Sequence, residues 1–184
     1  MKKILIGIIV VVVLVALYGW TIYNRLVTAS ENTDNQWAQV ETQYQRRLDL
    51  IPNLVESVKG IMKQEQAVFN AIAEARTRYA GAGTANEKAA AATQVESSLG
   101  RLLVVMENYP QLKSAENVQT LMVQLEGTEN RVSVERKRFN DMVRDFNLVI
   151  KRFPSSVIAG LFGFTERSYF EAAPEAQAAP QVQL

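Results

Sequence analysis

The sequence predicts an all-α protein, with an N-terminal transmembrane helix followed by an elongated antiparallel bundle of long helices. Three observations support this fold class. Residues 4–23 carry no charge, apolar side chains then recur at alternating steps of four and three along two long tracts, and only nine glycines and five prolines interrupt the 184 residues. Such steps place apolar side chains on one face of a helix that packs against other helices.

Composition excludes several kinds of functional site. Cysteine and histidine are both absent, so disulfides, thiolate metal sites and histidine-based acid–base catalysis are excluded. The 20 lysines and arginines balance 19 acidic residues, and a net charge of +1 provides no strong field that would attract nucleic acid. We therefore expect no catalytic residues, no cofactor, no metal ion, no nucleic-acid partner and no enzymatic activity.

The predicted membrane span, residues 4–23, follows a basic N-terminus at residues 1–3. At about 1.5 Å per helical residue, the span matches a hydrocarbon core of about 30 Å. A cleaved signal peptide is the alternative, but the apolar run is long for a signal and passes directly into polar helix. The anchoring side chains, which end in an aromatic belt at the headgroups, are Ile4, Leu5, Ile6, Ile8, Val12, Leu14, Leu17, Trp20 and Tyr23.

The charges beside the span predict its orientation. Lys2, Lys3 and the amino terminus outweigh Arg25 on the other side. The positive-inside rule then predicts a cytoplasmic N-terminus and a bundle on the opposite side of the membrane.

Residues 24–35 form a predicted polar neck, or alternatively continue the helix of the span. An apolar seam follows from Trp37 to Tyr79 and crosses Pro52 without losing phase. We interpret Pro52 as a kink within one helix, because the residues around it include large aliphatic side chains and no glycine. A corner between two helices is the alternative, since it would give a more compact bundle.

Two more helices complete the predicted bundle, which covers residues 36–170. A glycine-rich turn at residues 81–84 separates the first helix from a second at about 86–108. The third runs to about Arg152, where Phe153 and Pro154 end it.

Beyond Pro154, residues 157–164 form a short apolar segment. This segment either lies back on the bundle, which we favour slightly, or contacts a membrane interface or a partner groove. Residues 171–184 are rich in alanine, proline and glutamine, and we expect this tail to be disordered.

Polar residues near the seams are candidates for interaction. Arg46, Arg47 and Asp49 beside Pro52 form either a docking patch or, as we favour, a solvated face with local ion pairs. The acidic residues around Glu129 are more typical of a salt-bridge lattice than of a metal site, which in a bundle normally uses Glu-x-x-His. Asparagines next to the seam, Asn140 and Asn147, could set helix register or self-association.

Three stretches give the chain a resemblance to the LemA family. They are RRLDLIPNLVESVKG at residues 46–60, EGTENR at residues 126–131, and the segment from FND to IKRFP at residues 139–154. The resemblance implies a single-pass membrane protein with a soluble antiparallel helical bundle, without enzymatic activity or cofactor. The family-motif positions are Arg46, Arg47, Asp49, Pro52, Asn53, Glu129, Asn130, Asn140, Asp141, Asn147, Phe153, Pro154 and Phe164.

The resemblance also implies a link to membrane organisation, including the formation of intracellular membrane compartments in some bacteria. We therefore expect a scaffold in a bacterial inner membrane, with its bundle on the periplasmic side. Its expected partners are the lipid bilayer, further copies of the chain and other membrane proteins. The alternative is an accessory protein that regulates a membrane-bound enzyme such as a protease.

Overall fold

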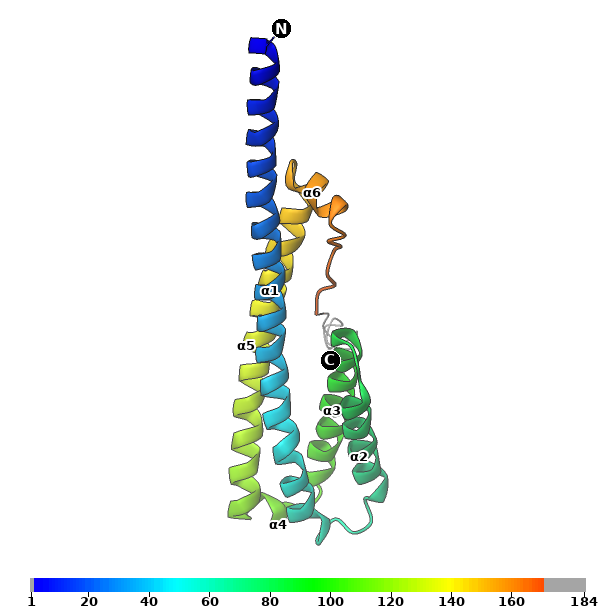
Figure 1. The fold of residues 1–184 in the computed structure, drawn as a ribbon. Coiled ribbons are helices and arrows are strands. Elements are labelled where there is room, and N and C mark those ends of the chain that lie inside the picture. Colours follow the sequence, from blue (N-terminus) through cyan, green and yellow to red (C-terminus); the bar gives the residue numbers. More distant parts are fainter. Residues whose placement is uncertain (1, 171–184) are drawn as a thin grey trace, which may run out of the picture. The chain divides into compact units, whose positions relative to one another are not determined.

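The computed structural model describes residues 2–170, which form six α-helices and no strand (Figure 1). This confirms the all-α prediction. The predicted tail, residues 171–184, lies outside the described residues. The helices are α1 (Lys2–Lys59), α2 (Gln66–Gly81), α3 (Ala85–Met106), α4 (Pro110–Lys113), α5 (Glu116–Lys151) and α6 (Ser155–Leu161).

The first helix, α1, is continuous over 58 residues and includes the span, the neck and the start of the apolar seam. Pro52 lies inside this helix, so the alternative interpretation of Pro52 as a corner between two helices is wrong. The expectation that this helix reaches Tyr79 is also wrong, because α1 ends at Lys59 and turns follow up to Glu65.

The seam keeps its phase across this break because of Met62. Gly60 follows the end of α1, and glycine favours helix termination. The backbone N–H of Met62 still donates to the carbonyl of Val58 at 2.9 Å, and its side chain is fully buried. Met62 therefore fills a core position from a turn, and a spacing pattern cannot distinguish this from a helix.

The chain divides into two compact units, to which α1 and α5 both contribute. Unit 2 holds Gln39–Arg136 and Phe170. In Figure 1, α2 and α3 form a hairpin within this unit. Thr84 caps α3: its side chain accepts from the backbone of Glu87, whose carboxylate accepts from the Thr84 backbone. The core contains Val40, Ile51, Leu54, Val58, Met62, Leu102, Leu112, Val118 and Val132.

Unit 1 holds residues 2–38 and 137–169. Here α1 and α5 run antiparallel: Trp37 meets Phe139 at 5.3 Å between ring centroids, and Leu26 packs with Phe146 and Ile150. Phe153 and Pro154 separate α5 from α6, as predicted, and Ala159 of α6 completes the cluster around Leu26.

Candidate functional site

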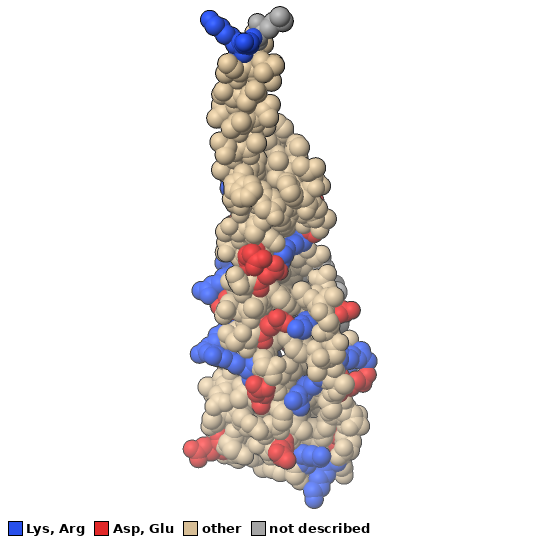
Figure 2. All heavy atoms as spheres, in the orientation of Figure 1, with Lys and Arg blue, Asp and Glu red and all other residues tan. Residues whose placement is uncertain are grey.

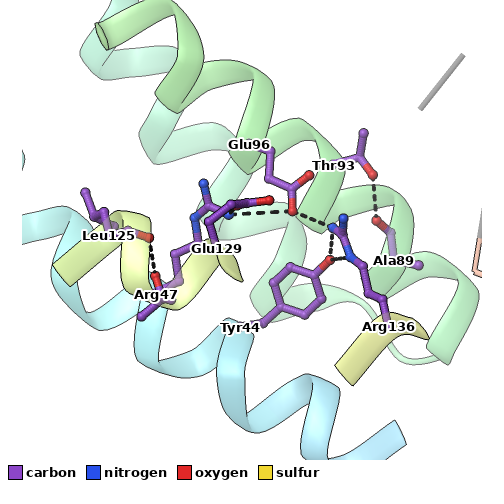
Figure 3. Close-up of polar contacts among 9 residues, drawn as sticks. Tyr44, Arg47, Ala89, Thr93, Glu96, Leu125, Glu129 and Arg136 are labelled. Atoms are coloured by element: carbon purple, nitrogen blue, oxygen red, sulfur yellow. Dashed lines mark hydrogen bonds and ion pairs between the residues drawn. The ribbon is translucent and has the colours of Figure 1, made fainter. Parts of the chain in front are cut away.

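A polar network of unit 2 links α1, α3 and α5 (Figure 3). The carboxylate of Glu96 on α3 pairs with Arg136 on α5, and lies 3.7 Å from Nη1 of Arg47 on α1. Glu129 on α5 also pairs with Arg47. Arg136 further donates through Nε to the hydroxyl of Tyr44 at 2.6 Å. We call these five residues the three-helix network.

Burial makes the charge balance of this network important. The Arg47 side chain is only 11% exposed, and loss of hydration lowers its pKa while Glu96 opposes that shift. Burial is also the main cause that raises the pKa of Tyr44, so its hydroxyl stays protonated. Two arginines facing two glutamates are neutral overall, and partly buried charges are tolerated only when they are paired in this way. The network therefore joins three helices in one register.

The predicted patch beside Pro52 is not one cluster in the structure. Arg46 and Asn53 are exposed, and exposed Asp49 accepts a hydrogen bond from Gln45 at 2.7 Å. Arg47 instead turns inward to the three-helix network. Pro52 is half-buried.

On α5, the predicted positions also separate. Glu129 belongs to the three-helix network, whereas Asn130 is exposed. Asn140 is half-buried and engaged in an interaction, and Asp141 pairs with Arg144 at 3.1 Å on the surface.

Asn147 on α5 forms hydrogen bonds with the C-terminal segment of unit 1, at Arg167. Its buried amide donates to the carbonyl of Arg167 at 2.9 Å and accepts from the same residue's N–H at 3.0 Å. The Arg167 guanidinium donates hydrogen bonds to Asp34 at 2.7 Å and to Ser30 at 2.9 Å, both on α1. The hydrogen bond with Asp34 raises the pKa of Arg167. The oxygen and the nitrogen of the Asn147 amide are therefore both hydrogen-bonded within the same chain.

The predicted anchor residues lie on the first part of α1, and all of them except half-buried Tyr23 are exposed. Ile4, Leu5, Ile6, Ile8, Val12, Leu14, Leu17 and Trp20 are each more than half exposed. Among the described residues, α1 is the one helix long and apolar enough to cross a membrane, and its apolar window has none of its residues buried. Tyr23, at the end of the run, contacts the ring of Phe162 at 4.7 Å between centroids.

The motif residues after α5 have different surroundings. Phe153 is largely exposed and Pro154 half-buried. Phe164 packs against the cluster around Leu26, at 6.4 Å from the ring of Phe146.

An apolar groove opens on unit 2 where α3, α4 and α5 meet. Its volume is about 460 Å³, and Leu103, Leu112 and Met122 contribute to its lining. Val123 at its edge is 68% exposed. Within residues 2–170, no group of three acidic side chains that could hold a metal ion is present.

Sequence reasoning missed Glu96 and the inward position of Arg136. The available signal was that each of these two residues lies close in the sequence to the apolar positions of a helix seam. It also missed the pair between Asp34 and Arg167, for which no local signal exists because 133 residues separate them.

The chain is similar to one protein family and to three magnetosome proteins. The model of the LemA family matches residues 36–184. Two magnetosome proteins of Paramagnetospirillum magneticum, MamQ 1 and MamQ 2, are each 26% identical to the chain over 178 residues, covering 83% of it. Magnetosome protein MamQ of Magnetospirillum gryphiswaldense is 25% identical over the same share. The chain spans 65% of the length of each of these relatives.

Proposed function

Because the chain belongs to the LemA family, we propose that it is a membrane-anchored, non-enzymatic scaffold that associates with further copies of itself. α1 serves as the anchor and unit 2 as the contact surface. The observation that carries the proposal is an open apolar groove on a chain whose first helix can cross a membrane.

The groove suits contact with a helix. Its lining is mostly apolar and includes Leu103 and Met122, and Val123 and Leu103 are exposed at the surface. Exposed apolar surface of this kind is typical of protein-interaction sites, and helices bind such grooves through apolar side chains one turn apart. Anchoring in one membrane raises the effective concentration of the copies, which favours weak self-association.

The proposed place of action is the bacterial inner membrane, with the N-terminus in the cytoplasm. Three relatives are named as magnetosome proteins, which supports a role in organising a membrane or envelope compartment. A single cysteine in place of exposed Asn130 tests the orientation of the chain in the membrane, because the wild-type chain contains no other cysteine that a thiol reagent could label. An impermeant maleimide should label Asn130→Cys in intact cells, and labelling only after lysis would reverse the orientation.

Cross-linking in native membranes tests the scaffold. A short bismaleimide should join Val123→Cys chains, each of which carries one thiol, into a covalent dimer. Asn130→Cys is the matched control, because it is exposed on the same helix but does not line the groove.

The pattern of products discriminates between the two functions. One dominant product with a foreign membrane protein would instead favour an accessory role, for example with a protease. Equal, low cross-linking of both variants would contradict the groove as a contact surface.

A further inference from the structure

We propose that α6 and its flanking residues, 153–164, form a second membrane-contacting element, which lies in the lipid interface beside the end of the α1 span. This inference rests on the proposed function only in requiring that α1 crosses the bilayer. The two faces of α6 and their position along α1 all lie within unit 1.

One face of α6 is fixed to α1 and α5. Ala159 is buried against Leu26, Phe146 and Ile150. Ile158 approaches α1 so closely that a Cβ added at Gly19 would lie 3.6 Å from its Cδ1. These contacts hold α6 at a defined place beside α1.

The opposite face is apolar and uncovered. Val157 and Leu161, one helical turn apart, are 60% and 75% exposed, and Phe153 before the helix is 84% exposed. Phe162 after the helix is also exposed. A surface of this kind is unfavourable in water and marks a contact with a membrane or a partner.

The position along α1 identifies the lipid interface as the occupant. The contact at Gly19 lies four residues before Tyr23, which ends the apolar run. At about 1.5 Å per residue this is about 6 Å inside the span. Interfacial helices bury their apolar face by about 5–10 Å, the same depth.

Charge supports the same occupant. No charged residue occurs from Phe153 to Phe164, whereas Arg152 and Glu166 flank this stretch. On the face drawn in Figure 2, an almost uninterrupted uncharged surface extends from below the basic tip over the region of α1 and α6. The exposed face of α6 is therefore continuous with the surface that the bilayer covers around α1.

Three valines allow a matched test by nitroxide labelling of the full-length chain, which has no cysteine of its own. Val12 in the span, Val157 on α6 and Val104 on α3 are 60%, 60% and 66% exposed. Each is replaced by cysteine, labelled, and reconstituted in vesicles of phosphatidylcholine and phosphatidylglycerol. Electron paramagnetic resonance then measures collisions with oxygen, which concentrates in lipid, and with a water-soluble nickel chelate.

The expected result is that Val157→Cys resembles Val12→Cys. Oxygen should collide with both labels several-fold more often than the chelate does, and Val104→Cys should show the reverse. Leu161→Cys should repeat the result for Val157→Cys. Circular dichroism of each labelled protein should match the wild type, since all these positions are exposed.

Three outcomes would overturn the proposal. Behaviour of Val157→Cys like that of Val104→Cys would place α6 in water. Shielding from both reagents, with spin–spin broadening between labels, would show that a second copy covers the face. Failure at Val12→Cys would remove the anchor, and with it the proposed function, whereas failure at Val157→Cys alone would leave that function standing.

Discussion

The charge of Glu96 is expected to hold the three-helix network together. Its carboxylate is the shared partner of Arg47 and Arg136, which come from two different helices. Glu96→Gln keeps the size of the side chain and removes its charge. The two guanidinium groups then remain near each other with only Glu129 to balance them.

The expected loss of stability lies between two limits. Removing one partner of a buried ion pair costs about 3–5 kcal/mol, and an exposed pair is worth about 0–1 kcal/mol. Arg47 is mostly buried, but Glu129 continues to neutralise it, so we expect about 2 kcal/mol for Glu96→Gln. For a chain of this size, this lowers the melting temperature by about 4–8 °C.

Circular dichroism melting of the full-length protein in detergent measures this change. Glu74→Gln is the control, because Glu74 pairs with Arg78 one turn along the exposed face of α2. Such pairs contribute about 0.2–0.5 kcal/mol, so the control should melt within about 2 °C of the wild type. Equal melting of Glu96→Gln and Glu74→Gln would refute the assignment of a register-fixing role to the network.

Three further predictions concern the other contacts that define the fold. Phe146→Ala should lower the free energy of unfolding of unit 1, measured in urea, by about 3–5 kcal/mol, because it leaves a cavity in the cluster around Leu26. A smaller loss would show that the neighbouring side chains move in to fill the cavity. The pKa of Glu87 is lowered mainly by the backbone N–H of Thr84, so its stabilising effect is present above the ordinary value of 4.5 and is lost as pH falls through the lowered value. The difference in melting temperature between wild type and Glu87→Gln should therefore shrink in acid, and a constant difference would contradict the cap. Asn147→Ala should release the segment at Arg167, seen as faster hydrogen exchange there, while unchanged exchange would show that Asp34 alone holds the segment.

Local sequence patterns account for most of the helices. The uncharged run predicts the span, Gly81 and Thr84 mark the turn between α2 and α3, and Phe153 and Pro154 mark the end of α5. Each of these signals depends on residues that are neighbours in the chain. This is why they can be recognised from one sequence.

The features that sequence reasoning missed depend on distant partners. Met62 occupies the core from a turn, so the seam continues where the helix does not. Arg136 looks like one member of a basic surface run until Tyr44 and Glu96 are placed beside it. Arg167 meets Asp34 only because the chain returns along α1.

The short apolar segment after α5 could not be assigned from its composition, because it satisfies both interpretations at once. Ala159 and Ile158 pack against the cluster around Leu26, whereas Val157 and Leu161 are exposed. The contacts of Ile158 with Gly19 and of Phe162 with Tyr23 relate this segment to the depth of the span.

The proposed function depends on the association of anchored copies of this chain with one another. Light scattering of the full-length protein in detergent, corrected for bound detergent, measures the protein mass of the particle. We expect a protein mass of two or more times 20.6 kDa, and Val123→Glu should reduce it. A particle that contains a single 20.6 kDa chain at every concentration tested would contradict the scaffold.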